Sequence, residues 1–234
     1  MSNPRMWRGV NVLMGFSMIN ELRMAELLCT RLCHDLTGPI GAVNNGVEFL
    51  NEEDNGGMQG QAIELITSSA FSAVTRLQFF RMAYGNVKDQ GEANLAEKQK
   101  IAADFFTGSK ITLDWPDNHT DASGVSISLK MSRLIYNVLI LTGGTLIRGG
   151  TIAVRISQNA EGERQVMFNA SGPGLKWDEE TQRILAGQFT VEELTPKNVQ
   201  LYLTKRFADD IRATITHHAE SEELNLQITQ PPDV

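Results

Sequence analysis

Apolar residues recur at steps of three and four along residues 20–50 of the chain. This spacing places them on one stripe of a helix. The polar, glycine-containing run at 51–60 predicts a turn, and a second stripe of the same spacing follows it. The first stripe consists of Leu22, Ala25, Cys29, Leu32, Leu36, Ile40, Val43, Val47 and Leu50, and the second of Ile63, Ile66, Ala70, Ala73, Leu77, Phe80 and Tyr84. We therefore predict an antiparallel hairpin of two long helices.

A single helical hairpin cannot bury both of its apolar stripes. Two hairpins from two copies of the chain can do so as a four-helix bundle. The pattern therefore predicts a homodimer with a dimeric four-helix bundle.

Beyond residue 86 the spacing of apolar residues no longer follows steps of three and four throughout. The sequence predicts a strand at 110–116, a long apolar helix at 128–147, a strand hairpin at 151–172, a helix at 177–187, a helix that runs into a strand at 198–218, and a last strand at 223–230. Helices mixed with antiparallel strands favour an α/β sandwich with helices on one sheet. We divide the chain into an N-terminal extension (1–19), the helical hairpin (20–86) and the α/β sandwich (87–234).

Composition narrows the function classes. The 234 residues are 41% hydrophobic and 21% charged, with a net charge of −7, as in an ordinary globular protein. An acidic chain is a poor candidate for nucleic-acid binding, because phosphate contacts need clustered Lys and Arg. Cys29 and Cys33 lack further ligands for a zinc site, and we interpret them as small apolar residues of a reducing compartment.

The N-terminal extension combines Arg5 and Arg8 with a short apolar run. No small-residue cleavage site follows, and the run is too short to cross a membrane. We expect a disordered or loosely docked extension of a cytoplasmic protein, with no membrane partner.

His34 and Asp35 stand inside the apolar pattern of the first helix. If Leu32 and Leu36 face the core, His34 falls at the most solvent-facing heptad position. A metal ligand would need a second ligand three or four residues on, where Thr37 and Gly38 stand instead. The pattern therefore favours a chemically active histidine over a core histidine or a metal ligand.

Small or uncharged residues continue the face of His34, namely Thr37, Gly38, Gly41, Asn44 and Asn45. Glycine inside a helix costs about 1 kcal/mol relative to alanine. We interpret this face as room for another protein to approach the imidazole. The alternative is that the glycines only accompany the kink at Pro39.

The neighbours of His34 suit nucleophilic chemistry. A neutral imidazole is a good nucleophile near pH 7, and Asp35 could orient the ring and accept its second proton. Arg31 could reach a phosphoryl group or an acidic rim. The alternatives are a solvated surface acid and a solvated surface arginine.

The stretch "HDLTGPI" resembles the H-box of histidine-kinase dimerisation domains. "SRLIYNVLILTGGTLIRGGTIAV" resembles the N-box helix, and "NASGPGL" the D-x-G-x-G loop of the ATP-binding domain. The resemblance implies that His34 is the phospho-acceptor, Asp35 its acidic partner and Pro39 the kinking proline. It also implies a histidine-kinase-ATPase-like fold for the α/β sandwich.

Three features depart from the kinase pattern. Asn137 matches the first asparagine of the N-box, but Leu141 stands at the second, and Ala170 replaces the adenine-binding aspartate. The lid-like stretch 194–207 has no glycine. Leucine cannot ligate magnesium, and alanine cannot accept a hydrogen bond from adenine. We therefore expect an α/β sandwich that lacks a working nucleotide site, with no cofactor and no metal held by this chain.

The combination of "LCHDLTGPIGAVNNGVEFL" with such a degenerate domain is similar to the ChpT family of alphaproteobacterial histidine phosphotransferases. The resemblance implies a homodimer that relays phosphoryl groups through His34 between the receiver domain of a hybrid histidine kinase and response-regulator receivers. The receiver would supply the magnesium and the aspartate. The candidate receiver-binding residues are Arg31, Thr37, Gly38, Gly41, Asn44 and Asn45.

Two other functions stay open. One is an ATP-dependent sensor histidine kinase with unusual boxes, which would autophosphorylate. The other is a non-enzymatic dimeric scaffold that binds receivers without transfer, in which His34 is incidental.

Overall fold

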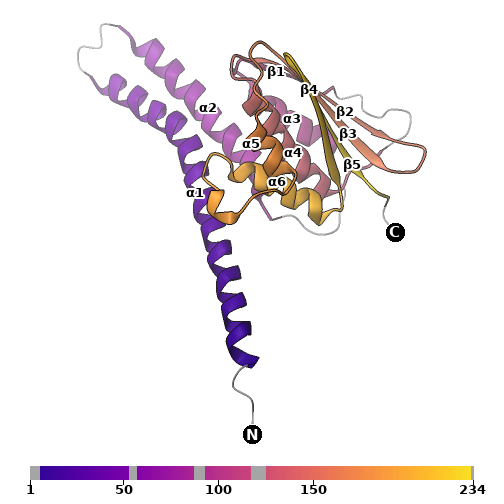
Figure 1. Cartoon of the computed structure of the whole chain (residues 1–234). Helices are drawn as coiled ribbons and strands as arrows, with labels where there is room; N and C mark the ends of the chain where they lie inside the picture. The colour runs from indigo at the N-terminus through magenta and orange to yellow at the C-terminus, as the bar shows by residue number, and fades with distance from the viewer. Residues whose placement is uncertain (1–5, 53–56, 87–92, 117–124, 233–234) are drawn as a thin grey trace.

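The computed structural model describes residues 6–52, 57–86, 93–116 and 125–232, with side chains from residue 21 onward. Figure 1 shows a helical hairpin beside a layer of helices and a sheet. The hairpin consists of α1 (Met6–Asn51) and α2 (Gln59–Tyr84), as predicted. The interior of the predicted turn, 53–56, lies outside the described residues.

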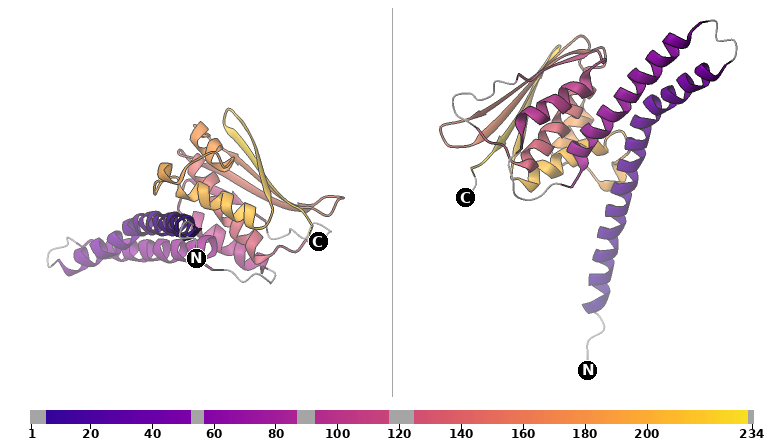
Figure 2. Two further views of the ribbon diagram at one scale, coloured as in Figure 1. Left: turned by 60° about the horizontal axis from the view of Figure 1, so that its bottom comes forward. Right: turned by 180° about the vertical axis from the view of Figure 1, so that it is seen from behind.

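The first helix is longer than expected. We predicted a disordered or loosely docked extension at 1–19; residues 1–5 lie outside the described residues, and from Met6 onward the extension is helical and belongs to α1. The sequence from Met6 to Gly38 contains no proline that would break the helix, and Pro39 lies inside it. Figure 2 shows that the N-terminal part of α1 projects beyond the rest of the molecule and that the helix bends along its length.

The two hairpin helices approach closely at Gly46, which is buried. A Cβ atom there would lie 2.6 Å from Cγ1 of Ile66 and 3.2 Å from the carbonyl oxygen of Ala62. Glycine at this position therefore sets how closely α1 and α2 pack.

The rest of the chain forms the α/β part. Its elements are α3 (Leu95–Phe106), β1 (Ile111–Asp114), α4 (Leu129–Thr145), β2 (Gly150–Gln158), β3 (Arg164–Ser171), α5 (Glu179–Leu185), the single turn η1 (Val191–Glu193), α6 (Val199–Asp210), β4 (Thr214–Glu220) and β5 (Glu223–Gln230). We did not predict α3, although Asn94 caps its N-terminus by accepting a hydrogen bond from the amide of Glu97.

The sheet has the order β1-β2-β3-β5-β4. We expected antiparallel strands, and this is wrong for β1, which pairs with β2 in parallel. The reason is the connection, because α4 lies between the two strands in sequence and carries the chain back to the same end of the sheet. The other strand pairs are antiparallel.

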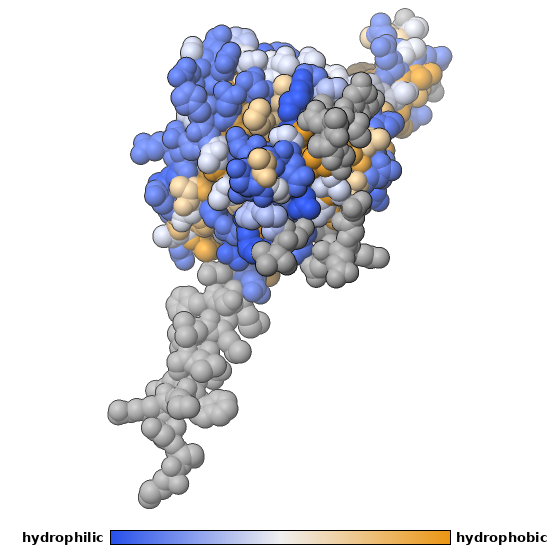
Figure 3. Space-filling model, turned by 90° about the vertical axis from the view of Figure 1, so that its right-hand side faces the viewer, coloured by the Kyte–Doolittle hydropathy of each residue, from blue (hydrophilic) through white to orange (hydrophobic). Residues whose placement is uncertain are grey.

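The α/β part has two layers, with its helices on one face of the sheet (Figure 1). The core lies between them and includes Ile152, Phe168 and Leu226 of the sheet and Leu134 of α4, all buried. The hairpin packs on the helical layer through buried residues of α2 such as Phe79. The opposite, outer face of the sheet is mostly hydrophilic (Figure 3).

Candidate functional site

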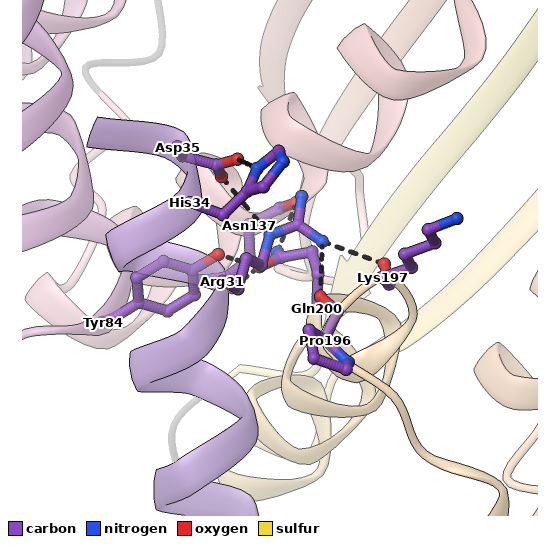
Figure 4. Close-up of polar contacts among 8 residues, drawn as sticks. All are labelled: Arg31, His34, Asp35, Tyr84, Asn137, Pro196, Lys197 and Gln200. Carbon is purple, nitrogen blue, oxygen red and sulfur yellow. Dashed lines mark hydrogen bonds and ion pairs between the residues drawn. The ribbon is translucent and has the colours of Figure 1, made fainter. Parts of the chain in front are cut away.

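His34 lies on α1 where the hairpin passes the α/β part (Figure 4). Its side chain is 87% exposed, and its Nδ1 atom lies 3.3 Å from Oδ1 of Asp35. The outward orientation that the heptad predicted is therefore present. If Asp35 accepts the hydrogen of Nδ1, the lone pair of Nε2 is left free for attack on an approaching electrophile.

Arg31 stands one turn before Asp35 on α1. Its Nε atom lies 3.7 Å from Oδ2 of Asp35. Its Nη1 atom donates to the carbonyl oxygens of Lys197 at 2.9 Å and of Pro196 at 3.4 Å. The side chain is 21% exposed, so the alternative of a fully solvated arginine is wrong. Contact of Arg31 with a receiver stays a prediction.

A second arginine binds the same stretch of the α/β part. Arg23 Nη2 donates to the carbonyl oxygens of Glu192 at 3.2 Å and Leu194 at 3.3 Å. We call residues 191–197 the clasp segment. Because Arg23 and Arg31 lie eight residues apart, they share one face of α1, and both use backbone carbonyls of this segment.

The clasp segment is itself held by hydrogen bonds. Thr190 and Glu193 form a capping box, and Arg183 donates to Glu193 at 2.7 Å. The hydrogen bond from Arg183 and, to a smaller extent, the one from the Thr190 amide hold the pKa of the Glu193 carboxyl below its usual range. The buried Asn198 accepts from the amide of Thr195 at 2.7 Å. The carbonyls that receive the two arginines therefore have defined positions.

A buried polar network of the α/β part lies next to Arg31 (Figure 4). The Tyr84 hydroxyl donates to Oε1 of Gln200. Gln200 Nε2 donates to Oδ1 of Asn137 at 2.8 Å, and Asn137 Nδ2 donates to the carbonyl oxygen of Ala83 at 2.7 Å. Burial raises the pKa of Tyr84 to about 12, and the positive charge of Arg31 partly opposes this shift. Asn137 thus joins α2, α4 and α6.

The residues at the positions that match the kinase nucleotide motifs either pack in the core or stand where the backbone needs a glycine. Leu141 and Ala170 are buried apolar residues of the core. A Cβ atom at Gly172 would collide with the carbonyl oxygen of Gly149, and Gly174 has a φ of +69°. The two retained glycines are therefore required by the backbone of this fold.

Five of the predicted receiver-binding residues have short side chains or none and follow His34 on α1. We call Thr37, Gly38, Gly41, Asn44 and Asn45 the low surface. Nothing lies within 4 Å of a Cβ atom built at Gly38 or Gly41, so hairpin packing does not require either glycine. Gly38 also precedes Pro39, where a side chain would crowd the proline ring. Thr37 donates to the carbonyl oxygen of Cys33, Asn44 donates to Glu48, and Asn45 is exposed.

A groove beside this surface was not predicted from the sequence. Its lining comes from α1, α2 and the end of α3, and consists of Gly38, Pro39, Ala42, Ser68, Ser69, Phe71, Ser72, Thr107 and Gly108. Phe71 is 47% exposed there. The available signal was an aromatic residue among serines on α2, away from the apolar stripe. The contribution of Thr107 and Gly108 depends on the tertiary fold.

Other large apolar residues of the hairpin are also exposed. They follow both helices and include Leu22, Ile40, Val47, Ile63, Val74 and Leu77. All of them except Val74 belong to the stripes from which we predicted the hairpin. Cys29 and Cys33 are likewise exposed free thiols in the single chain.

Two properties concern the described residues as a whole. No helix in that part of the chain is both long and apolar enough to cross a membrane. Among the same residues, no group of three or more His, Cys, Asp or Glu side chains could hold a metal ion.

Comparison with known proteins gives concordant matches. The sequence model of the family described as "Histidine phosphotransferase C-terminal domain" matches residues 95–223. The chain is 30% identical over 207 residues to "Protein phosphotransferase ChpT" of Brucella abortus (strain 2308), covering 88% of this chain and 95% of that protein. A solved structure described as a bacterial phosphotransferase superposes with a TM-score of 0.74 at 30% identity, covering 88% of this chain and 96% of the other.

Proposed function

Because this chain belongs to the family of histidine phosphotransferases that includes ChpT, we propose that His34 is the residue that carries the phosphoryl group in its phosphorelay. The observation that carries this assignment is the exposed imidazole with Asp35 at Nδ1, which leaves Nε2 directed away from the protein's own groups. An exposed nucleophile with an orienting carboxylate suits transfer between two large partners.

The proposed reaction is an in-line displacement at phosphorus. The bond from Nε2 to phosphorus forms as the acyl-phosphate bond of a receiver phospho-aspartate breaks, and the aspartate leaves as a carboxylate. Asp35 retains the hydrogen bond from Nδ1 and stabilises the positive charge on the phosphorylated ring. Transfer to the aspartate of a second receiver reverses these steps.

We propose that the phosphoryl group comes from a receiver and not from ATP bound to this chain. Supporting this, the apolar Leu141 and Ala170 stand where a kinase has polar nucleotide ligands, and both pack into the core. The receiver partner would also supply the magnesium ion, so this chain holds no cofactor of its own.

We propose the groove around Phe71, together with the low surface of Thr37, Gly38, Gly41, Asn44 and Asn45, as the place where receivers bind. The groove offers an exposed aromatic ring among small polar residues, the composition of an interface anchor. Gly38 of its lining stands one turn after His34 on α1, so a receiver seated there would bring its aspartate near the imidazole.

We also propose that the active form is a homodimer in the cytoplasm. Large apolar residues of the predicted stripes are exposed on both α1 and α2, among them Ile40, Val47, Ile63 and Leu77, and a second copy would cover them in a four-helix bundle.

Phosphotransfer from a radiolabelled phospho-receiver of a hybrid histidine kinase tests the proposal, with the His34→Ala chain as control. We expect label on the wild-type chain and none on the variant, with equal circular dichroism spectra. A wild-type chain that stays unlabelled, or a variant that takes label, would overturn the assignment.

Two further measurements separate the alternatives. Label taken from ATP and magnesium without a receiver would identify an autophosphorylating kinase. Receiver binding that is the same in wild type and His34→Ala, with no label transfer to either, would identify a scaffold.

A further inference from the structure

Two series of polar contacts lie side by side at Arg31, one that starts at His34 and one that is buried in the α/β part (Figure 4). His34 contacts Asp35, Asp35 contacts Arg31, and Arg31 contacts the carbonyls of Pro196 and Lys197. Arg31 also acts electrostatically on Tyr84, whose hydroxyl bonds Gln200. The printed contacts therefore connect His34 to the backbone of the clasp segment, while the charge of Arg31 acts on Tyr84, which bonds the buried Gln200.

Asp35 alone would hold the imidazole loosely. Its carboxylate can rotate, and its contact with Nδ1 is 3.3 Å long. A guanidinium on the other oxygen restricts that rotation, and the Nε of Arg31 lies 3.7 Å from it. The guanidinium is restrained in turn, because Nη1 donates to a backbone carbonyl at 2.9 Å. The planar guanidinium holds Nε and Nη1 in a fixed fork that can face the two partners at once, a fixed geometry that the single nitrogen of an ammonium does not impose.

Arg23 also holds α1 to the clasp segment, so it provides a comparison for Arg31. Arg23 binds the carbonyls of Glu192 and Leu194 without any contact to Asp35 or His34. Arg31 differs by adding the contact to Asp35. The two arginines thus offer a comparison between a residue that joins the two parts and one that also reaches the reactive histidine.

We propose that Arg31 is a positioning residue for phosphotransfer, which transmits the fixed geometry of the clasp segment through Asp35 to the His34 ring. The α/β part would then contribute to the reactivity of His34 without binding a nucleotide. This inference rests on the proposed role of His34.

The test compares Arg31→Gln, Arg31→Lys and the matched control Arg23→Gln in the full-length chain. The first readout is the rate of label transfer to His34 at saturating phospho-receiver, which separates the chemical step from docking. The second is the ¹⁵N NMR spectrum of the His34 ring in the unphosphorylated protein, which reports the nitrogen that carries the proton. Thermal unfolding checks that each variant is folded.

We expect Arg31→Gln to lower the saturating rate by on the order of ten- to a hundred-fold, because small misplacements of reacting groups have effects of this size. Its NMR spectrum should shift from the Nδ1–H form toward a mixture of both tautomers. Arg31→Lys should fall between wild type and Arg31→Gln in both readouts. Arg23→Gln should match wild type in both.

Unchanged rate and spectrum in Arg31→Gln would overturn the inference. Equal losses in Arg31→Gln and Arg23→Gln would show that Arg31 only joins the two parts, which also overturns it. If the wild type takes no label at all, the proposed function fails, whereas the NMR comparison still reports whether Arg31 orients the ring.

Discussion

At the scale of single residues, Tyr84 shows how burial changes the chemistry of a side chain at the boundary between the hairpin and the α/β part. Its phenol is largely buried and bonds Gln200, and burial raises its pKa to about 12. Arg31 favours the phenolate and acts in the opposite direction, but the desolvation effect is larger. Tyr84 therefore remains a hydrogen-bond donor throughout the physiological pH range.

This shift predicts an alkaline loss of stability. An unfolded tyrosine ionises near pH 10, so between about pH 10 and 12 the folded state retains a proton that the unfolded state has lost. The free energy of unfolding should then fall as pH rises through this window, by up to about 1.4 kcal/mol per pH unit for one proton. Denaturant titrations at several pH values should show a shallower fall for Tyr84→Phe than for wild type.

Burial also raises the pKa of Tyr136. Because Tyr136 is present in wild type and in Tyr84→Phe, it contributes equally to the fall of the unfolding free energy with pH in both proteins. Identical pH slopes for wild type and Tyr84→Phe would contradict the assignment of the shift to Tyr84.

At the scale of elements, the glycines of α1 serve two different purposes. Gly46 lies where α2 approaches, and a Cβ there would meet Ile66 and the backbone of Ala62. Gly41 faces open space on the side of His34. Helix propensity disfavours both glycines equally, so only the surroundings distinguish a packing glycine from one that keeps a surface low.

We predict opposite stability changes for alanine at these two positions. Gly41→Ala should raise the free energy of unfolding by up to about 1 kcal/mol, because it adds a helix former in open space. Gly46→Ala should lower it by about 1–3 kcal/mol, because the added methyl group forces α1 and α2 apart. Chemical denaturation of both variants measures this difference.

The same variants test the low surface beside His34. If a receiver comes close there, Gly41→Ala should slow label transfer even though the protein is more stable. Transfer at the wild-type rate in Gly41→Ala would contradict a close approach at that position.

Period and turn signals predicted most elements, because α1, α2, α4 and the β2–β3 hairpin each carry a strong regular pattern. The short helix α3 was missed because it follows a polar run, and its cap at Asn94 was not recognised. The parallel pairing of β1 was missed because it depends on the path of the connection. The outward position of His34 could be predicted from Leu32 and Leu36, whereas the partners of Arg31 lie more than 160 residues away in sequence.

At the scale of the whole molecule, the hairpin and the sheet present different exterior surfaces. The hairpin exposes an apolar stripe that includes Leu77, 60% exposed. The outer face of the sheet is mostly hydrophilic (Figure 3), with Met167 as an isolated exposed apolar residue at 49%. Isolated apolar residues are normal on a surface, but several large exposed apolar residues along one hairpin indicate an interface.

We predict that Leu77→Glu converts a dimer into a monomer, because it places a charge in the centre of the proposed bundle. Met167→Glu is the matched control and should leave the dimer intact. Light scattering with size-exclusion chromatography at micromolar concentration measures both masses. A monomeric wild type, or a Leu77→Glu chain that stays dimeric, would contradict the proposed bundle.

Phe71 lies in the groove outside that stripe, and this allows receiver binding to be separated from dimerisation. Phe71→Ala should weaken receiver binding by about tenfold or more, since a truncated interface anchor typically costs 1–2 kcal/mol or more. The mass of the protein should stay the same. Calorimetry with the receiver measures the affinity, and unchanged affinity would place the receiver elsewhere.

The close contact between Gly172 and Gly149 has a consequence for how sequence motifs are interpreted. Gly172 stands where two backbone segments touch, while Ala170, two residues earlier in the same motif, packs into the core. The backbone of this fold requires a glycine at position 172 whether or not a ligand is bound. A glycine that matches a nucleotide-binding signature can therefore report the packing of two loops, and its presence alone does not predict a nucleotide.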